Sequence, residues 1–294
     1  MVSKIKKPEN SSIRLRKMEL SDMKGLMRLK NAESWNQTEN DWGLLIQYKD
    51  SINLVAETDN IIVGTVTAIN YANTVAWIGM MLVDKMHRGK GISKILLNET
   101  IKKLKKCKSI KLDATPAGWP VYKKIGFIDE YTLYRMTCPS VLKPSLIETY
   151  IKTEQLTEKD IPEVAKLDKI IFGADRTNLI YYLYANSPSL AFLTRENNKI
   201  TGFSLGRKGQ SFTQLGPVYA LSDEAVKALI KSALSKLSGK AVAIDIHMDK
   251  PEIENLLSAF GFTRQRSFER MYLQKNPSPG ITKYQYLISG PELG

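Results

Sequence analysis

The chain has 294 residues, of which 43% are hydrophobic and 25% charged, and its formal net charge is +13. This composition is typical of a globular protein and argues against a disordered or collagenous chain, while the length suggests two domains. No apolar run approaches the ~20 residues of a membrane span, and two cysteines are too few for a disulfide scaffold, so we expect a cytoplasmic protein.

The N-terminal part of the chain predicts strands around a short helix. The alternating stretch Ile13–Arg16 is typical of a strand, and Ser21 fits the N-cap of a following helix. Two runs, Asn53–Glu57 and Ile61–Ala68, flank a Thr-Asp-Asn turn and predict a hairpin. The run Val75–Val83 is apolar throughout, which favours a central strand covered on both faces.

A glycine-rich bend follows this run and leads into an amphipathic helix. The sequence then predicts a strand at Ile110–Ala114, a helix at Trp119–Ile125 and closing strands over Phe127–Met136. This order of elements indicates a mixed α/β fold.

The second half of the chain repeats the first at an offset of about 135 residues. The motifs recur in the same order: Gly126-Phe127 with Arg135-Met136 returns as Gly261-Phe262 with Arg270-Met271, Leu112-Asp113 as Ile244-Asp245, and Ile78–Met81 as Leu215–Val218. We therefore predict two copies of one fold.

Two prolines bracket a predicted joint between the copies, at residues 139–144. The predicted domains are residues 1–140 and 141–276. The remaining residues, 277–294, contain a strand-like stretch at Tyr284–Ile288, and we expect this tail to pack on a domain.

The segment from Asp84 to Lys94 carries the most chemistry, because it lies between the buried strand and the amphipathic helix. Small residues at Gly89, Gly91 and Ser93 let a ligand approach the backbone, and free N–H groups at a helix start favour phosphate. The segment matches neither a P-loop nor a good dinucleotide fingerprint. A plain helix start is the alternative interpretation.

Two motifs resemble the GNAT superfamily of N-acyltransferases. Arg88-x-x-Gly91-x-Ser93 is similar to that family's acyl-CoA pyrophosphate loop, with serine where glycine or alanine is usual. Val121–Phe127 is similar to its "LYEKLGF" segment. The resemblance covers the whole first copy and, more weakly, the second. It implies two tandem GNAT-like domains of the α/β (α+β) class, each a mixed, mostly antiparallel sheet flanked by helices.

The resemblance also implies acetyl-CoA as co-substrate and direct attack by a primary amine on the thioester. Tyr122 would protonate the leaving thiolate as a general acid. The pantetheine arm would pair with the backbone of the central strand, and the pyrophosphate would bind the loop. The implied cofactor contacts are Met81, Leu82, Val83, Arg88, Gly89, Lys90, Gly91, Ile92, Ser93 and Lys94.

Five residues are candidates for the acceptor site. Glu33, Trp35, Asp41 and Trp42 could receive a cationic amine, unless the tryptophans are core anchors and the acids are merely exposed. Asp113 is a candidate base or acceptor contact, with a strand-end carboxylate as its structural alternative. No side chain matches a base motif of the family, and Thr115 stands where the family often has asparagine.

The second copy lacks these features. Leu257 aligns with Tyr122, and the equivalent of the loop is shorter and carries Asp223 and Glu224. Because like charge opposes phosphate, we expect one acyl-CoA per chain. The second copy would then shape the acceptor pocket or form an interface.

Other functions have less support. A retired enzyme that binds acyl-CoA as a sensor or scaffold is the first alternative, and a nucleic-acid binder, suggested by the positive charge, is the second. His87 and His247 lie far apart, and no metal-ligand spacing occurs. We expect an acceptor that is a small-molecule amine or another amino group, with no nucleic acid, membrane, secretory signal or metal.

Overall fold

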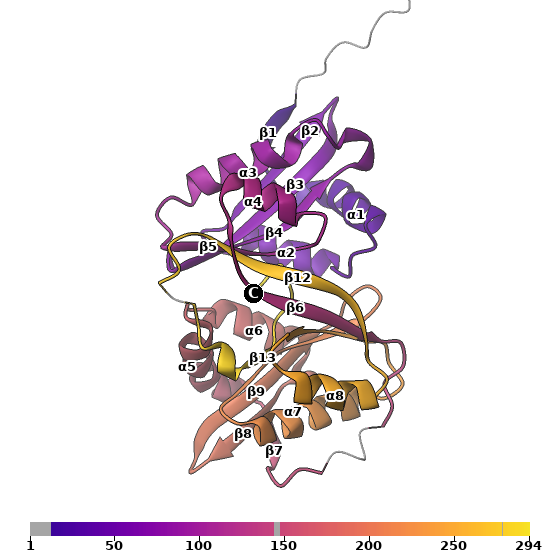
Figure 1. The fold of residues 1–294 in the computed structure, drawn as a ribbon, viewed down its shortest axis with the longest axis vertical. Coiled ribbons are helices and arrows are strands. Elements are labelled where there is room, and N and C mark those ends of the chain that lie inside the picture. The colour runs from indigo at the N-terminus through magenta and orange to yellow at the C-terminus, as the bar shows by residue number, and fades with distance from the viewer. Residues whose placement is uncertain (1–12, 144–147, 278) are drawn as a thin grey trace, which may run out of the picture. The chain divides into compact units, whose positions relative to one another are not determined.

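The computed structural model describes residues 13–143, 148–277 and 279–294 (Figure 1). The N-terminus, where we predicted no secretory signal, and Pro144 of the predicted joint lie outside these ranges. The described residues form two compact units. One comprises residues 13–68 with Met80–Lys105, and the other comprises Ile69–Gly79 with the described part of Lys106–Gly294.

The first unit holds four strands in the order β1-β2-β3-β4 and three helices. Strands β3 and β4 continue into the second unit. The strands are β1 (Arg14–Lys17), β2 (Ile52–Thr58), β3 (Ile61–Tyr71) and β4 (Val75–Val83), and the helices are α1 (Met23–Ala32), α2 (Glu39–Gln47) and α3 (Ile92–Lys103).

The helices of the first unit pack against β3 at two glycines. A Cβ atom added at Gly25 of α1 would lie 2.9 Å from the Ile62 side chain. A Cβ atom added at Gly64 of β3 would lie 2.8 Å from the Ile92 side chain. Leu96 and Leu97 of α3 are buried beside these contacts. The predicted central strand Val75–Val83 is confirmed residue for residue by β4.

The predicted N-cap at Ser21 is wrong. A 3-10 turn, Leu20–Asp22, precedes α1, and the Asp22 carboxylate accepts from the backbone N–H of Glu19 at 2.8 Å. The same carboxylate accepts two bonds of 2.8 Å from the Arg16 guanidinium. The charged Arg16 side chain on β1 thus holds the Asp22 carboxylate, and the N-cap of α1 is Asp22, one residue later than predicted. Charge-assisted hydrogen bonds are stronger than neutral ones.

The second unit contains the end of β3, the start of β4 and nine further strands. Their order is β4-β5-β12-β6-β11-β13-β10-β9-β8-β7, with an additional β10–β11 pairing. The strands are β5 (Ser109–Ala114), β6 (Ile128–Cys138), β7 (Thr153–Gln155), β8 (Phe192–Glu196), β9 (Lys199–Arg207), β10 (Thr213–Ala220), β11 (Val242–His247), β12 (Thr263–Gln274) and β13 (Gln285–Leu287).

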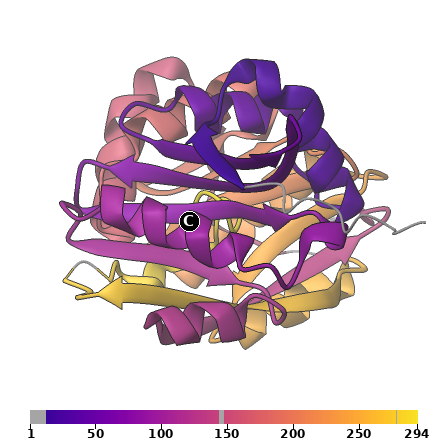
Figure 2. The ribbon, with the colours of Figure 1, turned by 90° about the horizontal axis from the view of Figure 1, so that it is seen from above.

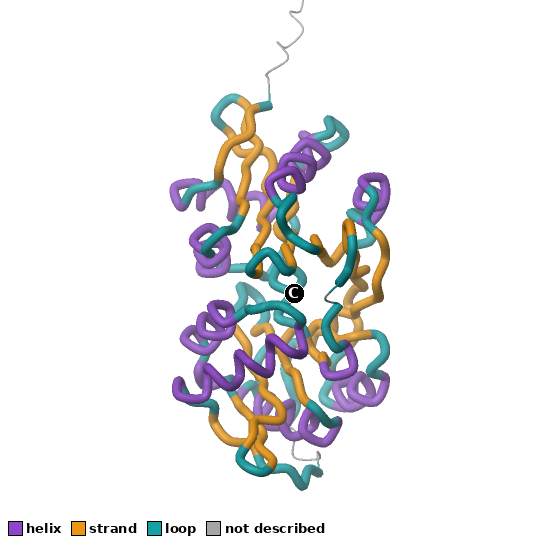
Figure 3. Tube along the Cα trace, turned by 90° about the vertical axis from the view of Figure 1, so that its left-hand side faces the viewer, coloured by secondary structure: helices purple, strands orange, loops and turns teal. Residues whose placement is uncertain are grey.

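The helices among the described residues of this unit accompany these strands (Figure 3, helices in purple and strands in orange). They are α4 (Trp119–Ile125), α5 (Ile161–Phe172), α6 (Thr177–Asn186), α7 (Asp223–Lys236) and α8 (Pro251–Ala259). The core of this unit is formed largely by the apolar faces of α7 and α8 against β10 and β11. The strands β4–β5 and β10–β11 pair in parallel, and the other described strand pairs are antiparallel. An isolated parallel bridge joins Val141 and Ser238 outside the strands. The predicted fold class is confirmed.

The two repeats exchange their last strands within the second unit (Figure 1). Strand β6 of the first repeat pairs with β11 of the second, and β12 of the second pairs with β5 of the first. β6 and β12 also pair with each other, and Figure 2 shows the yellow β12 from above. Their register is centred on Leu133 and Phe268, which hold the same position in the two repeats. This is the self-complementary pairing of a two-fold interface.

Two buried ion pairs repeat this symmetry. The Arg135 guanidinium of β6 donates two bonds of 2.8 Å to Asp245 of β11. The Arg270 guanidinium of β12 donates bonds of 2.7 and 2.9 Å to Asp113 of β5. The recurring arginine and aspartate of the sequence repeat therefore bind across the repeats and not within them.

Candidate functional site

The glycine-rich loop leaves β4 through a 3-10 turn, Lys85–His87, and enters α3 at Gly91. Gly89 and Gly91 have φ angles of 79° and 78°, in the left-handed region that glycine adopts without a steric cost. The space around both α-carbons is open, with no atom within 4 Å of an added Cβ. The loop thus presents an uncovered backbone at the start of a twelve-residue helix, a favourable arrangement for an anion.

Two cations of this loop, Arg88 and Lys85, contact the same carboxylate. The Arg88 guanidinium donates to Glu33 at 2.6 Å and to the Val83 carbonyl at 3.2 Å, and the Lys85 ammonium lies 3.8 Å from Glu33. Glu33 follows α1, so the sequence did not indicate this contact. The Glu33 carboxylate, predicted as an acceptor contact, instead contacts two cations of the glycine-rich loop.

Asp84 fixes the start of the loop. Its carboxylate accepts from the Arg28 guanidinium at 2.5 Å and from the backbone N–H of Met86 at 3.0 Å. The hydrogen bond from Arg28 is the main cause that lowers the pKa of Asp84, so the carboxylate is ionised at neutral pH.

The sequence did not indicate one further residue of β4, Met80. Met80 has a φ of 46°, although it is not glycine, and its carbonyl accepts from the Thr65 hydroxyl at 2.7 Å. Such backbone outliers cost on the order of 1–3 kcal/mol and cluster at ligand sites. It directly precedes the predicted arm contacts Met81–Val83, and no residue type marks it in the sequence.

Tyr122 belongs to the second unit, on α4, whose bounds match the prediction. It is buried, and its ring packs on Phe127 with centroids 5.8 Å apart. Burial raises the pKa of the Tyr122 phenol, so the hydroxyl keeps its proton at neutral pH. Thr115, in the family's asparagine position, accepts from the backbone N–H of Gly118 at 3.2 Å and helps to start α4.

The other acceptor candidates divide by burial. Trp42 is fully buried in α2, and Asp41 forms a capping box with Thr38, accepting from its backbone N–H at 2.6 Å. Trp42 is thus a core residue, the alternative that the sequence left open, whereas Asp41 is a buried capping residue, 3% exposed, and not an exposed acid. Trp35 is half-buried and lies between α1 and α2 in the chain.

Asp113 also has a structural partner. Its fully buried carboxylate lies against Arg270, whose guanidinium also donates to the Tyr131 hydroxyl at 2.6 Å. The geometry is that of a satisfied strand carboxylate, the alternative weighed above.

The second repeat differs at each corresponding position. Ser222 caps α7 by accepting from the backbone N–H of Ala225, and the Tyr286 hydroxyl donates to Asp223. Leu257, at the position of Tyr122, is buried in the hydrophobic core. This helix start therefore carries carboxylates and a tyrosine where the first repeat carries an open glycine loop.

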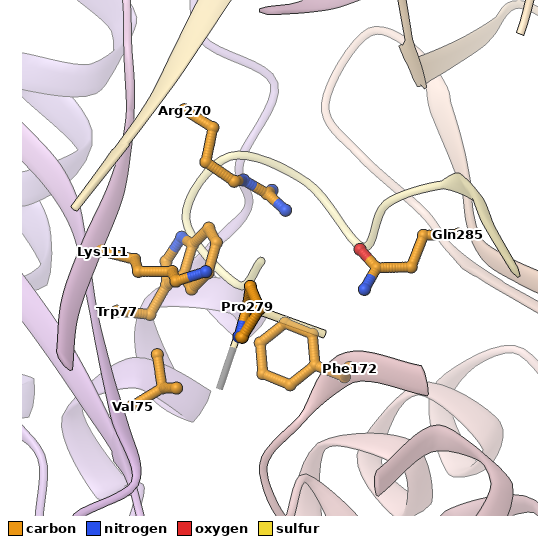
Figure 4. A pocket seen from close by; sticks show the side chains of 7 residues that line it. All are labelled: Val75, Trp77, Lys111, Phe172, Arg270, Pro279 and Gln285. Carbon is orange, nitrogen blue, oxygen red and sulfur yellow. The ribbon is translucent and has the colours of Figure 1, made fainter. Parts of the chain in front are cut away.

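A small pocket lies within the second unit (Figure 4). Trp77 and Lys111 lie on one side and Phe172 on the other, with Pro279 between them. Its space is close to that of one water molecule, so it is too small for an acyl acceptor.

Two negative findings apply to the described part of the chain. No cluster of three or more histidine, cysteine, aspartate or glutamate residues could hold a metal ion. No helix there combines the length and the apolarity of a membrane span.

Known proteins with similar sequences or structures are acyltransferases by name. The N-acetyltransferase YitH of Bacillus subtilis, described as uncharacterized, is 24% identical over 217 residues, or 74% of this chain and 76% of YitH. Holothin acyltransferase of a Pseudoalteromonas species is 28% identical over 233 residues, or 79% of this chain and 78% of that protein. The crystal structure of a protein provisionally called an acetyltransferase, from Pyrococcus horikoshii, shares the fold with a TM-score of 0.79 and 22% identity, over 97% of this chain and 98% of that one.

Two family models match different parts of the chain. The model of the acetyltransferase (GNAT) family matches residues 20–127, and a model of an acetyltransferase (GNAT) domain matches residues 164–287. Together these matches span well over half of the chain, and they agree with the internal repeat. The chain therefore belongs to the GNAT acetyltransferase family and contains two GNAT domains in tandem.

Proposed function

We propose that this protein is an N-acetyltransferase that moves the acetyl group of acetyl-CoA to a primary amine. The observation that carries the proposal is the open loop of Gly89 and Gly91 before α3, within the region that matches the GNAT family. The name of one relative, holothin acyltransferase, supports acyl transfer as the reaction.

In the proposed complex, the pyrophosphate binds the backbone N–H groups of residues 88–94, and Arg88, Lys90 and Lys94 compensate its charge. The pantetheine arm pairs with the backbone of Met81, Leu82 and Val83 in the manner of an added strand. Met80, with its positive φ, lies within β4 directly before this stretch.

The chemistry is a direct displacement. The amine nitrogen attacks the thioester carbon, the C–N bond forms, and the C–S bond breaks with its electron pair moving to sulfur. Tyr122 gives its proton to the thiolate, the positively charged nitrogen formed by the attack loses its proton to water, and the Tyr122 phenolate regains a proton from the solvent. Burial keeps Tyr122 protonated, and the same low polarity raises the proton affinity of a thiolate beside it.

The acceptor is an amino group, and Glu33 and Trp35 are the proposed contacts that are not fully buried. A carboxylate and an aromatic face together favour a cationic amine. The Glu33 carboxylate can reach an amine only when it leaves Arg88. The phosphate of the bound cofactor would allow this, because it would neutralise the charge of Arg88.

Calorimetry with acetyl-CoA and a thiol-release assay with a panel of amines test the proposal. We expect binding to the wild type, turnover with at least one amine, and a strong loss of binding in Gly91→Asp. Gly91→Asn is the matched control. Asparagine has the shape of aspartate without its charge, and it also tolerates the left-handed backbone of Gly91.

Unchanged affinity in Gly91→Asp contradicts the loop assignment. Binding without turnover of any amine indicates the alternative function, an acyl-CoA sensor or scaffold.

A further inference from the structure

Each repeat contains two neighbouring parallel strands that then separate, an arrangement that we call a fork. In the second repeat, another segment of the chain fills this fork. In the first repeat, β4 and β5 run parallel with Ala76 opposite Ile110 and Trp77 opposite Lys111. In the second, β10 and β11 run parallel with Thr213 opposite Val242 and Gln214 opposite Ala243. The motif alignment makes these pairs equivalent, so the register of the fork is the same.

Strand β13 of the tail enters the second fork where β10 and β11 separate. Leu287 lies opposite Val218 of β10 and opposite Ile246 of β11, so β13 pairs on both sides. Gln285 lies opposite Tyr219, and the backbone N–H of Ile288 donates to the Asp245 carbonyl at 3.0 Å. The fork is thereby closed by an added strand.

The residues that β13 covers are the equivalents of the proposed cofactor contacts. By the motif alignment, Val218 corresponds to Met81 and Tyr219 to Leu82. We infer that residues 285–288 occupy, in the second repeat, the position that the pantetheine arm of acyl-CoA takes in the first. This inference rests on the proposed placement of the arm along residues 81–83.

The burial and the hydrogen bonds of β13 indicate that it occupies the fork permanently. Tyr286, Leu287 and Ile288 are buried, and the Tyr286 hydroxyl donates to Asp223 at the start of α7. The Gln285 amide donates to the Ile171 carbonyl at 2.8 Å. A Cβ at Gly216 would lie 2.0 Å from the Ile288 carbonyl oxygen, so only glycine admits this close approach.

The tail continues from this fork to the beginning of β4, inside the same unit. The Trp77 indole N–H donates to the Pro291 carbonyl at 2.9 Å, and the Tyr71 hydroxyl donates to the Leu293 carbonyl at 2.8 Å. The second repeat thus anchors the tail from residue 285 to residue 294, which we call the strap. The strap contacts the central strand of the first repeat. The fork of the second repeat holds a peptide and excludes the cofactor.

Calorimetry of the full chain with acetyl-CoA separates this inference from the proposed function. We expect one acetyl-CoA per chain and none in Gly91→Asp. No binding to the wild type contradicts the proposed function. Two molecules per chain, one of which still binds in Gly91→Asp, overturn the inference while the proposed function stands.

Hydrogen exchange tests the occupant directly. We expect the amides of residues 285–288 to exchange slowly, and at an unchanged rate with saturating acetyl-CoA. Faster exchange on addition of acetyl-CoA shows displacement of the strap and overturns the inference.

A matched pair of variants tests the contact that holds the strap. In Gly216→Ala the same amides exchange faster, whereas in Gly239→Ala they do not. Gly239 also has a positive φ but no atom within 4 Å of an added Cβ. An unchanged exchange rate in Gly216→Ala contradicts the close contact with Ile288 and with it the inference.

Discussion

At the scale of single residues, Tyr122 combines the position of the proposed acid with a buried side chain. Tyr122→Phe keeps the ring that packs on Phe127 and removes only the hydroxyl. We expect kcat to fall roughly ten- to ten-thousandfold and the affinity for acetyl-CoA to remain. Stopped-flow measurement of thiol release, with the exposed Tyr181→Phe as control, checks this.

The raised pKa of Tyr122 adds a pH dependence. A general acid acts in its protonated form, so the rate is lost only as the pH rises through its pKa. Because burial moves this pKa above the usual value of about 10, kcat should show no loss due to Tyr122 up to about pH 10. A fall of kcat near neutral pH that disappears in Tyr122→Phe contradicts this assignment.

Glu33 is the second residue with a testable role, because it is paired with Arg88, which we propose to bind the cofactor phosphate. Glu33→Gln should tighten acetyl-CoA binding by up to about fivefold, the size expected for a partly exposed ion pair. Glu99→Gln, which removes the same charge from the exposed pair with Lys103, is the control. Equal affinities in the wild type and Glu33→Gln show that Glu33 does not compete with the cofactor.

At the scale of elements, the exchanged strands depend on the reciprocal ion pairs. Asp113→Asn leaves the Arg270 guanidinium buried beside a neutral amide. We expect the free energy of unfolding to fall by about 3–5 kcal/mol, as for other broken buried pairs. Asp129→Asn removes the exposed pair with Lys123 and should cost at most about 1 kcal/mol.

Urea unfolding of these two variants, and of Asp245→Asn, provides the comparison. The symmetry of the strands predicts similar losses for Asp113→Asn and Asp245→Asn. A loss for Asp113→Asn no larger than that for Asp129→Asn contradicts the role of the pair in holding β5 to β12.

At the scale of the whole molecule, His247 makes stability depend on pH. The side chain is 3% exposed and stacks on Tyr131, with ring centroids 4.7 Å apart. Burial is the main cause that lowers its pKa well below 6.5, and Arg270 and Lys250 add to it, while Gln285 opposes it. The folded state therefore keeps His247 neutral, whereas the unfolded state protonates it below about pH 6.5.

The sign of the effect follows from this difference. As the pH falls below about 6.5, the unfolded chain binds a proton that the folded chain does not. The free energy of unfolding should then decrease by up to about 1.4 kcal/mol per pH unit. Urea unfolding between pH 5 and 8 measures the slope, which His247→Gln should flatten and the more exposed His87→Gln should not. An equal slope in His247→Gln assigns the acid sensitivity to other groups.

The sequence alone determined the features that depend on local pattern. The apolar run Val75–Val83 and the segment Trp119–Ile125 predicted β4 and α4 residue for residue. The repeat predicted two copies of one fold, and two motifs resembling the GNAT superfamily predicted that this fold is GNAT-like. The small residues of the loop predicted an accessible backbone, and Gly89 and Gly91 have open space around them. These features follow from side-chain period and backbone sterics within a few residues.

Only the tertiary structure decided which strands pair, and with what. Strands β6 and β12 carry the same motif, so either could close either repeat, and long-range pairing selected the exchange. The stretch Tyr284–Ile288 was recognised as strand-like, but its place between β10 and β11 depends on the fork they leave open. Likewise, Glu33 follows a helix far from Arg88 in the chain, and only folding brings the two charges together, because Coulomb attraction depends on distance in space.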